Sequence, residues 1–162
     1  MRTMLMIFSL LVIPFSSADE CYLTPEQRSV LYFSYSYGSP HDYGYTLAAI
    51  AMEESDLGRW TINLQDPSAS PWGVTIDKAV KKLGWKHTPF NYNRAAQLLM
   101  DDIFFGAGLA METLLWWDKR REGNWRKVVE SYNAGYGNNP EYVNRIIGHI
   151  RKIKECGWLE TE

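Results

Sequence analysis

Apolar residues recur at helical spacing through most of the chain, and the most informative of these stretches is short. Residues 47–55 read Leu-Ala-Ala-Ile-Ala-Met-Glu-Glu-Ser, without an internal Gly or Pro, and Ala, Leu and Met favour helix. At about 100° per residue, Leu47 and Ile50 share one helix face with Glu54. The pattern therefore predicts a helix whose apolar face ends in Glu54, whereas Glu53 points away from that face.

Helix-start and helix-stop signals divide the rest of the chain. The run Thr24-Pro25-Glu26-Gln27 combines an N-cap threonine, a proline at the first helical position and a glutamine at the capping-box position. Asn124 and Asn139 are the expected caps of two later helices. The predicted helices are 25–37, 42–58, 77–83, 93–121, 125–133 and 140–157.

Two stretches depart from a simple helical pattern. Residues 59–75 contain three turn-forming groups, Asp66-Pro67-Ser68, Ser70-Pro71 and Gly73, which predict a loop with a short strand pair. A long irregular segment directly after a functional residue is often functional itself. Within 93–121, the small residues Gly106, Ala107, Gly108 and Ala110 predict that another helix packs very close, because glycine otherwise weakens a helix.

The predicted fold is accordingly mainly α, a single domain with a long loop or short β element after the helix that ends in Glu54. A length of 162 residues suits one domain with a real core. The 7 Trp, 10 Tyr and 6 Phe can pack that core or line a groove for sugar rings or peptides. A net charge of −2 gives no basic footprint, so nucleic acid is not an expected partner.

The first 18 residues have the pattern of a secretory signal peptide. Arg2 provides a short positive region, residues 4–15 are apolar with an interrupting Pro14, and Ser16-Ser17-Ala18 offers small residues for cleavage. The apolar run is short for a membrane span, although a retained anchor is the alternative. We expect a mature domain of residues 19–162, exported to the periplasm or the extracellular space, with no membrane span after cleavage.

The two cysteines lie near opposite ends of this mature chain. In an exported protein, Cys21 and Cys156 are expected to form a disulfide that ties the ends together. Two unpaired buried thiols are the alternative. The three histidines, His41, His87 and His149, show no metal-ligand spacing, so neither a metal nor an organic cofactor is expected.

Glu54 is the first candidate for chemistry. A carboxylate at the end of an apolar stripe is partly desolvated, which raises its pKa and lets it hold a proton near neutrality. A general acid for breaking a glycosidic bond needs this property. The alternative is a structural Glu54 at the edge of the core, solvated or paired with an arginine.

A second group of polar residues lies at the end of the predicted helix 125–133. Tyr132 and Asn133 stand side by side before Ala134-Gly135. The amide could bond the N-acetyl group of an amino sugar, and the phenol could reach a carboxylate or stack on a ring. Taken alone, Asn-Ala-Gly is also an ordinary helix end.

The order of these segments resembles that of the soluble lytic transglycosylase family and of its goose-type lysozyme relatives. The matching residues are Glu54-Ser55 at the end of an apolar helix, then Tyr132-Asn133-Ala134-Gly135, then Tyr142-Val143 on a closing helix. The likeness covers about residues 24–153. It departs from the family after the catalytic helix, where Pro71-Trp72-Gly73-Val74-Thr75-Ile76 replaces a Gly-Leu-Met-Gln-like run, so no groove residues are carried across that loop.

The resemblance implies a lysozyme-like fold and a lytic transglycosylase that cleaves the β-1,4 bond between N-acetylmuramic acid and N-acetylglucosamine in peptidoglycan. Glu54 would act as acid and then as base, and Ser55, Tyr132 and Asn133 would bind substrate. The partner would be the glycan strand. The sequence leaves open whether the setting is wall turnover, an envelope-spanning secretion or conjugation apparatus, or a phage.

Two other functions remain open at this point. A lysozyme that hydrolyses the same bond normally needs a second carboxylate, and Asp66 and Asp56 are the nearest candidates in the sequence. A secreted glycan-binding or assembly protein on the same scaffold would have no turnover, and Glu54 would then be structural.

Overall fold

A computed structural model describes residues 21–63 and 65–160 of the chain. The predicted signal peptide, 1–18, lies outside them. The described part is mainly helical, as predicted, with a small three-stranded sheet after the second long helix. Its elements in order are α1 (Pro25–Gly38), η2 (Ser39–His41), α2 (Gly44–Ser55), β1 (Ile62–Asn63), β2 (Ser68–Ala69), β3 (Val74–Thr75), α3 (Ile76–Lys82), α4 (Pro89–Asp101), α5 (Ile103–Arg120), α6 (Trp125–Ala134) and α7 (Pro140–Glu155).

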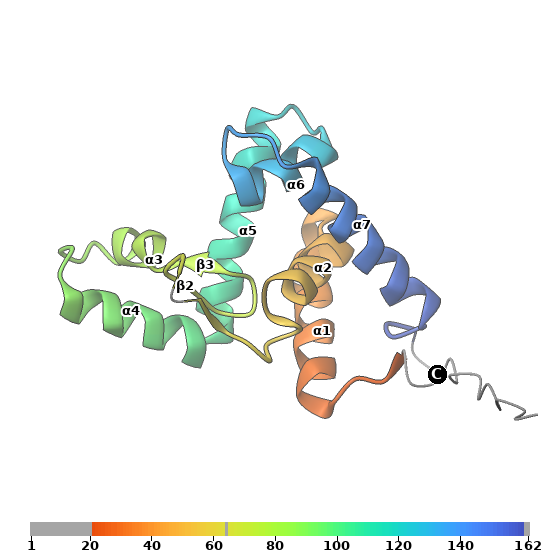
Figure 1. The fold of residues 1–162 in the computed structure, drawn as a ribbon, viewed down its shortest axis with the longest axis horizontal. Helices are drawn as coiled ribbons and strands as arrows, with labels where there is room; N and C mark the ends of the chain where they lie inside the picture. Colours follow the sequence, from red (N-terminus) through yellow and green to blue (C-terminus); the bar gives the residue numbers. More distant parts are fainter. Residues whose placement is uncertain (1–20, 64, 161–162) are drawn as a thin grey trace, which may run out of the picture.

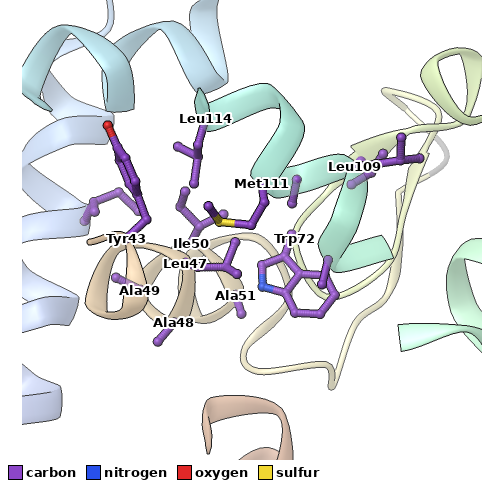
Figure 2. Close-up of a cluster of buried hydrophobic side chains, with 14 of the residues drawn as sticks. Tyr43, Leu47, Ala48, Ala49, Ile50, Ala51, Trp72, Leu109, Met111 and Leu114 are labelled. Carbon is purple, nitrogen blue, oxygen red and sulfur yellow. The ribbon is translucent and has the colours of Figure 1, made fainter. Parts of the chain in front are cut away.

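Helix α2 lies at the centre of the molecule, with α1 and α7 as its most extensive neighbours. Every residue from Leu47 to Ala51 is fully buried. Figure 2 shows Leu47, Ile50 and Ala51 on the side of α2 that faces Met111 and Leu114 of α5 and the indole of Trp72, whereas Ala48 and Ala49 lie on the opposite side. The helix is therefore buried all round rather than along the single face that the pattern predicted, as expected of a helix that is apolar on every side.

The helix ends follow local chemistry. At the start of α1, Thr24 accepts the N–H of Gln27 at 3.2 Å and its own N–H reaches the Gln27 side chain at 3.1 Å, so the predicted capping box is confirmed. Helix α2 ends at Ser55, earlier than predicted, because Asp56 and Leu57 have positive φ angles of 52° and 56°. That left-handed turn stops the helix immediately after the glutamate pair.

The irregular segment after α2 forms three two-residue antiparallel strands in the order β1-β2-β3, one more than the predicted pair. Residues Ser68 to Trp72 are buried. The segment is therefore packed into the molecule, and its polypeptide chain passes beside the end of α2.

The single helix predicted for residues 93–121 is wrong. Two helices, α4 and α5, meet at Asp102, whose backbone is extended (φ −110°, ψ 97°) and whose carboxylate accepts the N–H of Phe105 at 3.0 Å. Asp102 is thus an N-cap hidden in a continuous apolar pattern. Helix α4 also begins before the predicted start, because Thr88 caps it and Pro89 occupies its first position.

The small residues of α5 do allow another segment to pack close, but at Gly106 that segment is the loop before β3 and not a helix. A Cβ added at Gly106 would lie 3.0 Å from the Cβ of Ser70 and 3.4 Å from the indole of Trp72. The buried loop therefore packs there. At Gly108 the close neighbour is the Tyr37 hydroxyl of α1, at 3.4 Å.

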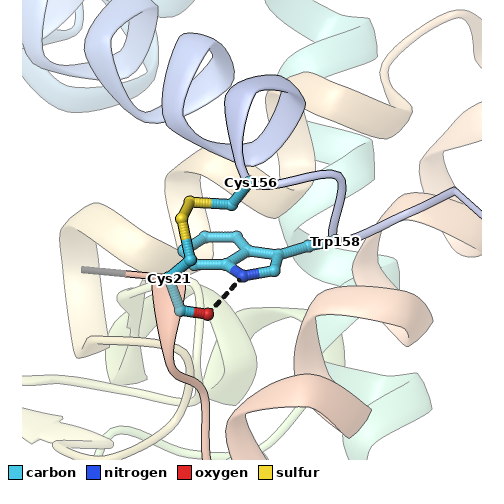
Figure 3. The surroundings of a disulfide bond; sticks show 3 residues. All are labelled: Cys21, Cys156 and Trp158. Atoms are coloured by element: carbon cyan, nitrogen blue, oxygen red, sulfur yellow. Dashed lines mark hydrogen bonds between the residues drawn. A yellow bond between two sulfur atoms is a disulfide. The ribbon is translucent and has the colours of Figure 1, made fainter. Parts of the chain in front are cut away.

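The disulfide between Cys21 and Cys156 is present, with a Cα–Cα distance of 5.5 Å across 135 residues of sequence. Figure 3 shows Trp158 beside it, and the indole N–H of Trp158 donates to the Cys21 carbonyl at 2.8 Å. Closing so long a loop stabilises the chain by up to about 4–5 kcal/mol in chain-entropy terms. Within residues 21–63 and 65–160, no helix has the length and apolarity needed to cross a membrane.

Candidate active site

The last turn of α2 carries Glu54 against the first turn of α7. The hydroxyl of Tyr142 donates to Glu54 Oε1 at 2.7 Å, and the Tyr142 side chain is buried at 1 % exposure. The helix cap fixes this tyrosine, because the Asn139 side chain accepts the Tyr142 N–H at 3.1 Å. Glu54 therefore has a rigid, neutral hydrogen-bond donor as its partner.

The other carboxylate oxygen of Glu54 faces Gly73. A Cβ added at Gly73 would lie 2.6 Å from Glu54 Oε2, and Gly73 has a φ of +62°. Only glycine combines this left-handed conformation with so close an approach. The backbone of the loop before β3 therefore covers one side of the carboxylate.

Ser55 holds this loop to the helix. Its hydroxyl lies 2.8 Å from the Pro71 carbonyl and 3.0 Å from the Ala51 carbonyl, and it accepts the N–H of Gly58 at 2.8 Å. Ser55 is 2 % exposed, so its contacts are internal and a substrate meets it only if the loop moves. In this conformation the residue positions the loop, and the substrate contact that the family resemblance implies for Ser55 stays a prediction.

Tyr132 and Asn133 are adjacent in sequence but have different contacts. Tyr132 donates to the Trp72 carbonyl at 2.8 Å and so braces the same loop from α6. Asn133 is exposed, and its side-chain oxygen accepts the Asn139 amide at 2.7 Å. Tyr132 thus lies inside the site, beside Glu54, while Asn133 lies at its surface.

Burial dominates the electrostatics of Glu54 and raises its pKa above the ordinary value of 4.5. The Tyr142 hydrogen bond and the charge of Arg145 lower the pKa, whereas the charges of Glu53 and Asp66 raise it. Burial likewise raises the pKa of Tyr142 and of Tyr132. Both phenols are therefore neutral donors at ordinary pH, and Glu54 is the group that can exchange a proton.

Glu53, the preceding residue, has different partners. Its carboxylate accepts from Arg145 Nε at 2.5 Å and lies 2.9 Å from His149 Nε2, and its side chain is 17 % exposed. The prediction that Glu53 points away from the core is wrong in this respect, because it faces α7. Since α2 is enclosed on all sides, both glutamates meet α7, Glu54 through a phenol and Glu53 through a guanidinium and an imidazole.

The two candidates for a second carboxylate differ. Asp56 directly follows α2 and has a left-handed backbone conformation. Its side chain is half exposed, and its carboxylate lies 3.6 Å from the guanidinium of Arg59. Asp66, in the turn between β1 and β2, is exposed, and its charge acts on the pKa of Glu54. Of the two, only Asp66 has this electrostatic effect on Glu54.

From the sequence, no site role is predicted for three residues, Tyr142, Gly73 and Arg145. Tyr142 appears there only within a motif and Gly73 only as a loop glycine. In the sequence, the first is marked by its place as the third residue of a capped helix, and the second by its position directly after a tryptophan. Arg145 has no such signal, because its role depends on the angle between α7 and α2.

Among the described residues, no three or more His, Cys, Asp or Glu side chains come together in a way that could hold a metal ion. Comparisons with protein-family models, with curated proteins and with solved structures gave no match to this chain. The function is therefore inferred from the geometry around Glu54 and from the sequence motifs.

Proposed function

We propose that the protein is a peptidoglycan lytic transglycosylase with a lysozyme-like fold and that Glu54 is its catalytic residue. The observation that carries the proposal is the environment of Glu54, a partly buried carboxyl with a neutral phenol donor and a raised pKa. A carboxyl of this kind can be protonated before the reaction and ionised after it. The ordered motifs Glu54-Ser55, Tyr132-Asn133 and Tyr142-Val143 supply the substrate class.

In the first step Glu54, protonated, gives its proton to the glycosidic oxygen, and the bond from muramic C1 to that oxygen breaks. N-acetylglucosamine leaves with the proton, and an oxocarbenium-like centre develops at C1. In the second step the Glu54 carboxylate takes the proton from the muramic C6 hydroxyl, whose oxygen bonds to C1. The product is a 1,6-anhydromuramoyl end, and Glu54 is protonated again for the next turnover.

The surrounding residues suit this cycle. Tyr142 stabilises the carboxylate stage by hydrogen bonding to it, while burial stabilises the protonated stage. Gly73 and Ser55 keep the loop backbone against one side of Glu54, so the carboxyl group is held in one orientation. Asn133 follows Tyr132 on α6 and is exposed, and its side-chain N–H groups would donate to the N-acetyl group of the substrate.

Hydrolysis is the second candidate, and one observation favours it. Asp66 is close enough for its charge to affect Glu54, and an ionised carboxylate on the loop could position a water molecule or stabilise the cation. Asp56 is a weaker candidate because Arg59 is its neighbour and it lies outside the helix.

An exported protein is consistent with the Cys21–Cys156 disulfide.

The deciding experiment is digestion of purified sacculi by the mature protein, residues 19–162, with mass spectrometry of the released muropeptides. The transglycosylase proposal expects 1,6-anhydromuramoyl ends that are 18 mass units lighter than reducing ends. Reducing ends that disappear in D66N would establish the lysozyme instead. Binding to sacculi without any release would establish a glycan-binding protein.

A further inference from the structure

A hollow lies between α3 and α5, lined by none of the residues around Glu54. It has a volume of about 500 Å³ and is lined by Lys78, Lys81, Glu112, Thr113, Trp116 and Trp117. Two indoles and two amines in one small hollow combine an apolar wall with positive charge. Neither the sequence motifs nor the proposed reaction uses any of these residues.

Lys78 is the distinctive residue of this hollow. Its amine reaches from α3 to α5, where it donates to the Leu109 carbonyl at 2.8 Å and to the Thr113 hydroxyl. Both acceptors are neutral, and within the described residues no carboxylate lies within 4.0 Å of the amine. Burial lowers the pKa of Lys78, while the charge of Glu112, which is not in direct contact with the amine, raises it by less. A partly buried cation without a direct ion-pair partner is unfavourable.

The other charges of the hollow are already compensated. Lys81 pairs with Asp77 at 2.6 Å, and Glu112 pairs with Lys82 at 2.7 Å. Lys78 is therefore the amine of the hollow without a direct ion pair, and the guanidinium of Arg120 lies nearby, over the Trp116 ring at 3.6 Å. A ligand with a negative charge complements these cations.

The tryptophans indicate the rest of the ligand. Trp116 is 43 % exposed, whereas Trp117 is only 6 % exposed and contacts it edge-on with ring centroids 4.4 Å apart. The exposed part of Trp116 is therefore the indole surface that a ligand can reach. Indole surfaces of this kind pack against the apolar faces of sugar rings. Trp117 is held in place by Tyr136, whose ring centroid lies 4.9 Å from its own.

We propose that this hollow binds a carboxylate-bearing amino sugar, whose carboxylate bonds to Lys78 while its ring packs on the exposed part of Trp116. The choice of muramic acid as that sugar rests on the proposed function. Muramic acid has a lactyl carboxylate when it is unsubstituted, and a peptide carboxylate when a stem peptide is attached. N-acetylglucosamine has the same ring and no carboxylate, so the hollow distinguishes the two sugars of the strand by charge.

The test uses the mature protein with the E54Q substitution, which prevents turnover, and follows the indole N–H signals by NMR. The probes are N-acetylmuramic acid, N-acetylmuramyl-L-alanyl-D-isoglutamine and N-acetylglucosamine. We expect the Trp116 and Trp117 signals to shift with at least one of the carboxylated probes, with about 10- to 100-fold weaker binding of N-acetylglucosamine. A response to N-acetylmuramic acid identifies the lactyl carboxylate, and a response to the dipeptide alone identifies the peptide carboxylate.

Lysine variants then test the charge. K78M should remove the preference for carboxylated sugars, and K78R, which keeps a cation, should restore part of it. K86M is the matched control, because Lys86 is exposed and outside the hollow, and it should bind as the parent protein does. Equal binding of all three probes, or an unchanged preference in folded K78M, would overturn the proposal.

The binding test of this hollow and the digestion test of the proposed function can succeed or fail independently of each other. If carboxylated sugars bind through Lys78 while wild-type protein releases nothing from sacculi, this site stands and the enzyme proposal fails. If sacculi are cleaved but the indole signals do not respond, the enzyme proposal stands and this site is rejected.

Discussion

Two carboxylates one residue apart on α2 have opposite surroundings. Glu53 lies against the guanidinium of Arg145 and the imidazole of His149. Glu54 lies against the phenol of Tyr142 and the backbone of Gly73. Burial beside a neutral donor raises the pKa of Glu54, so this carboxyl keeps access to both of its protonation states, whereas Glu53 is in ion-pair contact with Arg145. Identical side chains thus acquire different chemistry from the partner that the neighbouring helix presents.

The partners come from one stripe of α7. Tyr142, Arg145 and His149 follow one another at spacings of three and four residues, so they lie on one face of the helix. The turn of about 100° between Glu53 and Glu54 on α2 then decides which glutamate receives the phenol. Changes at these positions should therefore affect the two glutamates differently.

The largest expected effect is on turnover. We predict that E54Q lowers the rate of sacculus digestion by about 10²- to 10⁴-fold, because the amide cannot give or take the proton. E53Q should keep most of the rate, since its partners are charges rather than substrate. Release of soluble muropeptides measures both. A rate that survives in E54Q and falls in E53Q would reverse the assignment of the two residues.

The next effect concerns the loop that covers Glu54. In G73A the new methyl group would be placed 2.6 Å from Glu54 Oε2, so the carboxyl must move, and a displacement of about 1 Å can cost up to about 10²-fold in rate. G84A is the control, because Gly84 has a similar φ of +65° and nothing within 4 Å of its added Cβ. Both variants should lose about 1–2 kcal/mol of stability from left-handed strain, but only G73A should lose activity. Equal activities would show that the contact does not matter.

A smaller effect is expected in the pH profile of turnover. Glu54 must be protonated before turnover, so the midpoint of the alkaline limb, where the rate falls at high pH, follows the pKa of Glu54. Y142F removes a hydrogen bond that lowers this pKa, so the limb should move to higher pH. E53Q removes a charge that raises it, so the limb should move to lower pH. Y136F, at an exposed tyrosine, should leave the limb in place, and shifts of Y142F and E53Q in the same direction would contradict the account.

The smallest effect is on stability, again with opposite signs. Because folding raises the pKa of Glu54 above 4.5, its contribution to stability is complete below the unfolded value and is lost as the pH rises through the folded value. E54Q avoids this loss, so its melting temperature should exceed that of wild type at pH 7.5 and approach it near pH 4. E53Q should have a free energy of unfolding about 0.5–1 kcal/mol lower than wild type, because it loses the ion pair with Arg145, whose side chain is half exposed. Calorimetry at the two pH values measures both variants, and a melting temperature of E54Q below that of wild type at pH 7.5 would contradict the burial of Glu54.

Much of the fold could be predicted because its signals are local. The capping box at Thr24 and the caps at Asn124 and Asn139 are side-chain contacts within three residues, and each appears directly in the sequence. The break at Asp102 was missed because one extended residue does not interrupt an apolar period. The disulfide was predictable from the small number of cysteines and their positions near the two ends.

The site was predictable only in part, since its contacts are tertiary. Glu54 follows from the pattern of its own helix. Its neighbours Gly73 and Tyr142 come from segments 19 and 88 residues further along the sequence, and no periodicity specifies where they meet. The partners of Glu53 depend in the same way on the crossing of α2 and α7, so the expectation that it points away from the core was wrong.

The most direct measurement is an NMR titration of the Glu54 side-chain carboxyl carbon in the wild-type protein, assigned by comparison with E54Q and E53Q. The account predicts a midpoint above 4.5, the ordinary value, so that the carboxyl can hold a proton at the pH of the reaction. A midpoint at or below 4.5 would mean that Glu54 is held ionised like a paired surface glutamate, and it could not serve as the acid.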